Sequence, residues 1–288
     1  MRILGAIFCF LLCLAQPALA EAPLRYRPLE QQLSWLAAAN PGNVGIAALD
    51  LNTGEMVSVL GDEPFPMAST VKIAVAANYL SQVEFGRRSL DDTISGRSAR
   101  SLMEAMIIHS DNRATDILMR DLGGPATLQK WVDQHRIAGL RIDRNIATLL
   151  ADRRDLRDVR DSSTPKAMVE LLKRIDSGAL LKPQSRSYLL DLMARCATGS
   201  NRIRGLLPQG TLVQHKTGTL SGYTSDVGFI TLPNGHRIAV AMFARQGTNR
   251  PATIARAARA IFDGFTAVLR YPFQSASTTA TRTYANQQ

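Results

Sequence analysis

The stretch Ser69-Thr70-Val71-Lys72-Ile73-Ala74-Val75-Ala76-Ala77-Asn78-Tyr79-Leu80 is the part of the chain that decides the fold class. Its apolar residues cover nearly all sides of a helix, which predicts a helix buried within a larger fold. Ser69 and Lys72 lie three residues apart, so a hydroxyl and an amine would meet on one face of this helix. A lysine is rarely buried without a partner or a function, and Lys72 therefore indicates a functional site.

The regions on either side of this helix show strand patterns near both ends of the chain and helix patterns between them. Two strands are predicted at 44–51 and 56–60 around the turn Asn52-Thr53-Gly54, and three more at 212–216, 226–232 and 237–243. Helices are predicted at 29–39, 101–108, 114–122, 126–134, 165–175 and 187–194, and after the last strand. The polar segment 143–163 is expected to be irregular.

This order predicts an α/β (α+β) fold, in which a mixed sheet domain flanked by helices carries an inserted all-helical domain. We expect the sheet domain to comprise residues 21–68 and 197–274, and the helical domain residues 69–196. Residues 275–288 are expected to form a disordered tail. A cleft between the two domains is the expected place for a ligand.

The first 20 residues have the pattern of a cleavable secretory signal. Arg2 precedes an apolar stretch at 3–15, which is shorter than the ~20 residues of a membrane-spanning helix. Ala18-Leu19-Ala20 then has the small-x-small pattern of a cleavage site. We therefore expect a periplasmic mature chain without a membrane anchor, in which Cys196 is the one remaining cysteine and no internal disulfide forms.

The composition excludes several classes of protein. The 288 residues are 45% hydrophobic, which is ample for a core and excludes a disordered chain. The formal net charge is +10, but the arginines alternate with aspartates and have no aromatic interleaving, which favours a solvated face over a nucleic-acid groove. No heptad repeat demands a partner chain, so we expect a monomer that does not bind nucleic acid.

Two further tripeptides extend the chemistry of the first motif. Ser110-Asp111-Asn112 follows the helix predicted at 101–108, and Lys216-Thr217-Gly218 ends the strand that begins at 212. A serine hydroxyl becomes a nucleophile when a base takes its proton, and burial lowers the pKa of a lysine towards that role. Together with Ser69 and Lys72, in this order, the tripeptides predict a serine acyl-transferase site.

These three motifs resemble those of the class A serine β-lactamases and their penicillin-binding relatives, over nearly the whole mature chain. Arg141-Ile142-Asp143-Arg144 is similar to the entry of the family's Ω-loop, and Asp161-Ser162-Ser163-Thr164-Pro165 is similar to its exit. The resemblance implies a serine β-lactamase-like fold, no cofactor, and a salt bridge between Arg144 and Asp161 that closes the loop. It also implies β-lactams as substrates, with carbapenems among them.

The resemblance also implies the catalytic roles. Ser69 would attack the β-lactam carbonyl, Lys72 would take or relay its proton, and Ser110 would pass that proton to the departing ring nitrogen. Lys216 would complete the catalytic group. The backbone N–H groups of Ser69 and Thr219 would form the oxyanion hole, where preorganised donors stabilise the transition state.

The substrate contacts follow from the same resemblance. Asn112 would bind the acylamide side chain of the substrate. Lys216, Thr217 and Arg237 would receive its carboxylate, and this cationic group suits an anionic drug.

The chain departs from the family where the acyl-enzyme should be hydrolysed. The family's Ω-loop carries a glutamate and an asparagine that hold and deprotonate water, and here those places are occupied by Ile146 and Leu150. Since neither side chain activates water, the resemblance implies atypical deacylation. If the chain shifts, one of three carboxylates in the longer loop could act instead, those of Asp152, Asp155 and Asp158.

Three alternatives to a serine β-lactamase remain open. His109 and His215 directly precede two of the motifs, and a Zn²⁺ ion between them could activate water, although a catalytic zinc normally has three protein ligands. The chain could also be a cell-wall D,D-peptidase acting on peptidoglycan stem peptides. Finally, it could be a sensor that binds β-lactams or muropeptides without turnover.

Overall fold

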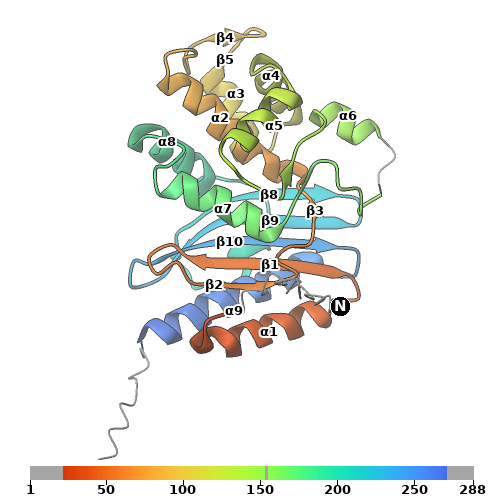
Figure 1. The fold of residues 1–288 in the computed structure, drawn as a ribbon, viewed down its shortest axis with the longest axis vertical. Helices are drawn as coiled ribbons and strands as arrows, with labels where there is room; N and C mark the ends of the chain where they lie inside the picture. Colours follow the sequence, from red (N-terminus) through yellow and green to blue (C-terminus); the bar gives the residue numbers. More distant parts are fainter. Residues whose placement is uncertain (1–21, 153–154, 271–288) are drawn as a thin grey trace, which may run out of the picture.

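A five-stranded antiparallel sheet in the order β2-β1-β10-β9-β8 lies between two helical layers in the computed structural model, which describes residues 22–152 and 155–270 (Figure 1). The strands are β1 (Asn43–Asp50), β2 (Met56–Val59), β8 (Val213–Leu220), β9 (Tyr223–Thr231) and β10 (Arg237–Arg245). Residues from Asn43 to Asp50 pair with β10 in antiparallel register, so the two distant parts of the chain form one sheet. The mixed α and β fold predicted from the sequence is confirmed.

The two faces of the sheet bury different sets of side chains because strand residues alternate between faces. One face packs against α1 (Arg27–Ala38) and α9 (Arg250–Arg270), through a buried cluster that includes Val240 and Phe265. The opposite face packs against the remaining helices through a larger cluster that includes Phe229 and Ile73. The catalytic motifs belong to this second side.

The helices above the second face surround one central helix, as the apolar stretch predicts. Lys72–Glu84 forms α2, in which all residues from Lys72 to Ser81 are buried. The neighbouring helices are α3 (Ala99–Ile108), α4 (Asn112–Asp121), α5 (Pro125–Gln134), α6 (Ile146–Ala151), α7 (Pro165–Asp176) and α8 (Pro183–Ala194). One buried cluster includes side chains of both α2 and the sheet. The predicted domain boundaries at residues 69 and 196 stay a prediction.

Short elements supplement those predicted. The segment expected to be irregular contains the six-residue helix α6 and the two-residue strand β7 (Ser162–Ser163), which pairs with β3 (Phe65–Pro66) and β6 (Leu140–Arg141). These strands were missed because two residues carry no readable alternation.

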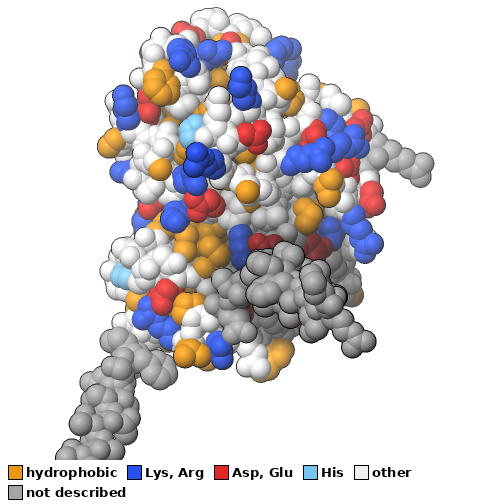
Figure 2. Space-filling view, in the orientation of Figure 1, with side chains coloured by type: hydrophobic (Ala, Val, Ile, Leu, Met, Phe, Trp, Pro, Cys, Tyr) orange, Lys and Arg blue, Asp and Glu red, His pale blue; other side chains and the backbone are white. Residues whose placement is uncertain are grey.

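The expected signal and tail cannot be compared with the structure, whereas the expected surface charge pattern can. The signal at 1–20 and the tail at 275–288 both lie outside the described ranges. Within those ranges, no helix combines the length and apolar character needed to span a bilayer. Figure 2 shows basic and acidic side chains interleaved on the visible face, in keeping with the alternation seen in the sequence.

Candidate active site

The nucleophile candidate Ser69 lies on a 3₁₀ turn, Ala68–Val71, directly before α2. Ala68 has a φ of 47°, in the left-handed region that costs a non-glycine residue about 1 kcal/mol or more. The hydroxyl of Thr70 donates to the carbonyl of Met67 and stabilises the turn. The helix therefore begins three residues later than predicted, while Ser69 and Lys72 stay one turn apart.

Lys72 is fully buried and points at the second serine motif. Its Nζ donates to the carbonyl of Ser110 at 2.7 Å, to Ser110 Oγ at 3.2 Å and to Asn112 Oδ1 at 2.8 Å. Within the described part of the chain, none of the acceptors to which it donates is a carboxylate. Burial, and next the charge of Lys216, lower the pKa of Lys72 to about 7. A substantial fraction is therefore neutral amine near pH 7, as a base must be.

Ser110 sits in a strained turn between α3 and α4. Its φ is 60°, and the next residue, Asp111, accepts from the N–H of Ala114 at 2.6 Å and so caps α4. The middle residue of this motif is therefore structural. The outer two, Ser110 and Asn112, both contact Lys72.

Lys216 comes from β8 and reaches the same serine. Its Nζ donates to Ser110 Oγ at 2.9 Å, and its side chain is fully buried. Burial lowers the pKa of Lys216 to about 8, and the charge of Arg202 acts in the same direction. The next residue, Thr217, shares a 2.5 Å hydrogen bond between its hydroxyl and that of Thr198.

Gly218 allows β8 to pass directly against the nucleophile's turn. A Cβ at this position would lie 2.8 Å from the carbonyl oxygen of Met67 and 3.1 Å from the Cβ of Ala68. Such approaches are too close, so only glycine lets the strand lie here. The following residue, Thr219, lies one position along the strand from this close contact.

Asn112 is the exposed member of the group, at the start of α4. Because its side-chain oxygen accepts from Lys72, its amide N–H₂ is left to donate to a ligand. This orientation suits a carbonyl acceptor on a substrate.

Arg237 does not join this group, and its predicted role as a carboxylate ligand is wrong. It begins β10 opposite Thr231, whereas Lys216 pairs with Val227, further along the same strand. Thr219 pairs with Thr224 of β9, which in turn pairs with Ala244 of β10. Ala244 is seven residues from Arg237 and therefore about 23 Å away along β10. The side chain of Arg237 forms an ion pair with Asp176 and donates to Gln214, so its charge is compensated at the far end of the sheet.

Arg202 occupies the place that Arg237 was expected to fill. Its NH1 donates to the carbonyls of Gly218 and Ser225 at 3.0 and 2.9 Å, and its NH2 donates to Thr219 Oγ1 at 2.8 Å. Arg202 was not predicted from the sequence. The available signal was weak: a turn-forming Gly199-Ser200-Asn201 precedes Arg202, but nothing in linear spacing relates it to Thr219.

The salt bridge expected between the two ends of the Ω-loop-like segment is present. Arg144 Nε donates to Asp161 Oδ2 at 2.6 Å, and both side chains are buried, which confirms the salt bridge. Asp161 Oδ1 also accepts from the backbone N–H groups of Asp143 and Arg144. Because the pair is buried and both carboxylate oxygens accept hydrogen bonds, it has more weight than an exposed ion pair.

Ile146 and Leu150 lie beside the cluster around Lys72. Both line a cavity of about 490 Å³ together with Asn112. Leu150 also lines a second cavity of about 590 Å³ with Thr219 and Asp155. The helix that carries them begins with the N–H groups of Ile146 and Ala147 donating to Asp116.

The loop's other carboxylates are engaged in different ways. Asp152 accepts from Arg144 NH1 at 2.6 Å. Hydrogen bonds from Arg160 lower the pKa of Asp158 to about 2, which makes that carboxylate a weak base. Asp155 accepts from the N–H of Arg157 and lines the cavity shared with Thr219.

The two histidines do not assemble into a metal site. The ring of His215 is fully buried and its Nδ1 lies 2.8 Å from Asp226 Oδ1, on the α9 side of the sheet. His109 is exposed at the end of α3, on the other side of the sheet. No group of three potential metal ligands occurs among the described residues.

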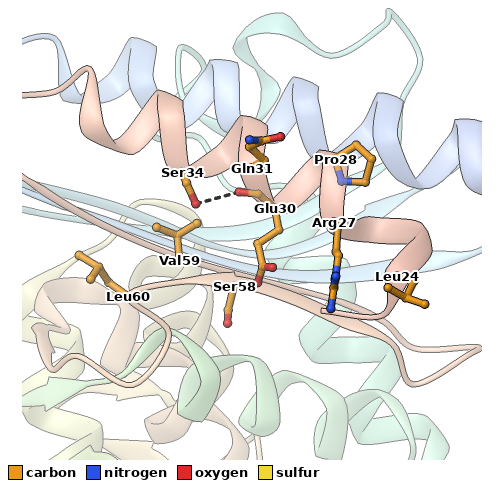
Figure 3. Close-up of a pocket in the computed structure, with 9 residues that line it drawn as sticks. All are labelled: Leu24, Arg27, Pro28, Glu30, Gln31, Ser34, Ser58, Val59 and Leu60. Carbon is orange, nitrogen blue, oxygen red and sulfur yellow. Dashed lines mark hydrogen bonds between the residues drawn. The ribbon is translucent and has the colours of Figure 1, made fainter. Parts of the chain in front are cut away.

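A separate hollow of about 850 Å³ lies at the opposite edge of the sheet (Figure 3). It is lined by α1 residues, among them Glu30 and Gln31, and by Ser58 and Val59 of β2. Since β2 and β8 are the two outer strands, this hollow is distinct from the cluster around Lys216.

Comparisons with known proteins identify the family of this chain. The model of the Beta-lactamase enzyme family matches residues 28–265. The Extended-spectrum beta-lactamase PER-1 of Pseudomonas aeruginosa is 29% identical, over 81% of this chain and 83% of that protein. The Carbapenem-hydrolyzing beta-lactamase KPC of Klebsiella oxytoca is also 29% identical, over 77% of this chain and 84% of that protein.

Solved structures give the same result. One titled Ancestral (GNCA) Beta-lactamase class A superposes with a TM-score of 0.79 at 33% identity, covering 82% of this chain and 100% of its own. A beta-lactamase from Chitinophaga pinensis has a TM-score of 0.78 at 28% identity, covering 83% and 99%. The chain therefore belongs to the β-lactamase enzyme family, as a β-lactam hydrolase of its class A serine type.

Proposed function

We propose that this enzyme opens β-lactam rings through an ester on Ser69 and releases the product without a carboxylate base at position 146. One observation carries the proposal: the amines of Lys72 and Lys216 both donate to Ser110 Oγ, at 3.2 and 2.9 Å. Because that oxygen's lone pairs accept these bonds, its own O–H proton is free for a leaving nitrogen.

In acylation, protons pass through a closed series of groups, which we call the proton circuit. The neutral amine of Lys72 takes the proton of Ser69 while Oγ bonds to the β-lactam carbonyl carbon. The C–N bond of the ring breaks, and the nitrogen takes the proton of Ser110. Ser110 regains a proton from the Lys72 ammonium, along the hydrogen bond that joins them.

Deacylation uses the same amine in this proposal. Water attacks the ester carbonyl, its proton passes to Lys72, and Lys72 then protonates Ser69 Oγ as that oxygen leaves. Support comes from the surroundings of Lys72, whose hydrogen-bond acceptors among the described residues include no carboxylate. Ile146 and Leu150 line the adjacent cavity, so we expect deacylation to be slower than acylation.

The proposed substrates carry a carboxylate, which would meet Lys216, Thr217 and Arg202. Carbapenems are included because a relative is named as a carbapenem-hydrolyzing enzyme. The signal-like segment at 1–20 supports a periplasmic site of action, and we expect the enzyme to act there as a monomer.

The test follows drug loss and intact mass when the mature chain meets a penicillin or a carbapenem. We expect hydrolysis with a transient adduct, unaffected by a chelator, and no adduct in Ser69→Ala. The double substitution Ile146→Glu and Leu150→Asn should accelerate deacylation by roughly a hundredfold, since a positioned general base contributes at least that much.

Other results would replace the proposal. A chelator-sensitive reaction would indicate a metal, and a permanent one-to-one adduct would indicate a binding protein for β-lactams. Release of D-alanine from a pentapeptide without drug hydrolysis would indicate a D,D-peptidase. Loss of deacylation in Asp155→Asn with acylation intact would identify Asp155, rather than Lys72, as the base.

A further inference from the structure

A buried carboxylate and imidazole lie beneath Arg202 and take no part in the proton circuit. Asp226 and His215 face the α9 side of adjacent strands, and both side chains are fully inaccessible to solvent. His215 Nδ1 lies 2.8 and 3.0 Å from the two oxygens of Asp226. An ionised carboxylate only accepts, so Nδ1 carries the proton in this bond.

Asp226 also holds the chain next to Arg202. Its Oδ2 accepts from the backbone N–H of Ile203 at 3.1 Å, which ties the start of the turn Ile203–Leu206 to β9. The guanidinium of Arg202 lies across the same strands and donates to the carbonyl oxygens of Gly218 and Ser225. The backbone and the side chain of Arg202 are thus fixed to one short section of the sheet.

The charge of Asp226 also acts on Arg202 itself. Burial lowers the pKa of Arg202, and the negative charge of Asp226 opposes that effect more than any other group does. No ion pair between Arg202 and a carboxylate occurs among the described residues, so its cation attracts an incoming anion. The charge of Asp226 also raises the pKa of the Lys216 amine, in opposition to the effect of burial.

We propose that Asp226, held by His215, is a positioning residue that fixes Arg202 at the end of β8 and thereby sets the affinity for the substrate carboxylate. The inference rests on the proposed function, because it assumes a carboxylate-bearing β-lactam at Ser69. Asp226 touches no reacting atom in this arrangement. Its loss should weaken binding of the carboxylate and leave the maximal rate of acylation nearly unchanged.

A second Asp–His pair, in which the carboxylate is buried and the imidazole is partly exposed, supplies the control. Asp50 is fully buried, its Oδ2 lies 3.0 Å from His236 Nδ1, and its Oδ1 accepts from the N–H of Asn52. This pair sits at the other end of the sheet, beside Arg237 rather than Arg202. Asp50→Asn should lower the stability of the fold as Asp226→Asn does, but it should not change the affinity for the substrate carboxylate.

The experiment measures acylation of the full mature chain by benzylpenicillin and by its methyl ester, which lacks the negative charge. For each variant, rapid mixing and mass analysis give the maximal acylation rate and the half-saturating concentration. We expect Asp226→Asn to raise the half-saturating concentration for the acid about tenfold, the scale of one charged hydrogen bond. The maximal rate and the values for the ester should change by less than about threefold.

A double-mutant cycle adds a second readout. If Asp226 acts through Arg202, then Arg202→Ala combined with Asp226→Asn should resemble Arg202→Ala alone. The inference would be overturned if the two substitutions raised the half-saturating concentration by independent, multiplicative factors. It would also be overturned if Asp226→Asn weakened binding of acid and ester equally, or if Asp50→Asn weakened binding of the acid as much as Asp226→Asn does. If the wild-type chain is not acylated by either compound, the proposed function fails first and this inference fails with it.

Discussion

The two ends of the five-stranded sheet carry similar residues and differ in how their positive charges are compensated. At the end near the nucleophile, Arg202 donates to two backbone carbonyls and to the hydroxyl of Thr219. At the other end, Arg237 pairs with Asp176 and lies over the ring of Phe229, 4.6 Å from its centroid. Both arginines are partly buried beside the sheet.

The difference shows what makes an arginine available to a ligand. The ion pair with Asp176 uses the charge of Arg237 for folding, whereas neutral acceptors orient Arg202 and leave its charge for an anion. The amines of Lys72 and Lys216 add to the positive potential at the same end. The anionic substrate should therefore bind at one end only, and three predictions test this contrast.

The largest effect is expected from removing a cation at the catalytic end. Lys216→Ala should slow acylation by a cephalosporin roughly 10²- to 10³-fold, because a preorganised donor to Ser110 is lost. Arg237→Ala should change acylation by less than about twofold. Stopped-flow absorbance with a chromogenic cephalosporin measures both, and comparable losses in the two variants would show that the sheet ends do not differ.

The next effect is a pH dependence that only the catalytic end can produce. Lys72 must be neutral to take a proton, and its pKa is about 7, so acylation should fall about tenfold per unit below that pH. Lys216 must be charged to hold the carboxylate, and its pKa is about 8, so binding should weaken above that pH. Together these give a narrow bell-shaped profile.

Lys216→Ala sharpens this prediction. Its charge is the second cause that lowers the pKa of Lys72, so its removal should move the acidic limb to higher pH. The measurement is the acylation rate from pH 5 to 9 with both proteins. An acidic limb that stays in place or moves to lower pH would exclude Lys72 as the titrating base.

The smallest effect concerns the far end of the sheet. Asp176→Asn removes the charged partner of Arg237 and should lower the free energy of unfolding by about 1 kcal/mol without changing acylation. The exposed pair of Arg259 and Asp263 is the control, and Asp263→Asn should change stability by less than about 0.5 kcal/mol. Urea unfolding compares the two, and slowed acylation in Asp176→Asn would contradict the separation of the ends.

Local sequence patterns predicted much of the fold and of the candidate site. The strand patterns, the buried helix after Ser69 and the turn at Asn52-Thr53-Gly54 were readable because side-chain periodicity reports burial directly. The salt bridge between Arg144 and Asp161 was predictable from the resemblance, since both residues lie within recognisable motifs. The 3₁₀ turn at Ser69 and the two-residue strands were not, because they depend on contacts with distant segments.

The sequence by itself determined which residues form the candidate site, because Ser69, Lys72, Ser110 and Lys216 stand within short motifs whose spacing follows helix and strand geometry. Only the tertiary structure decided which arginine accompanies them. The register between β8, β9 and β10 puts Arg237 at the far end and leaves Arg202, from a preceding turn, beside Thr219. Strand register is a long-range property, set by how both sheet faces are buried, and no local pattern around either arginine encodes it.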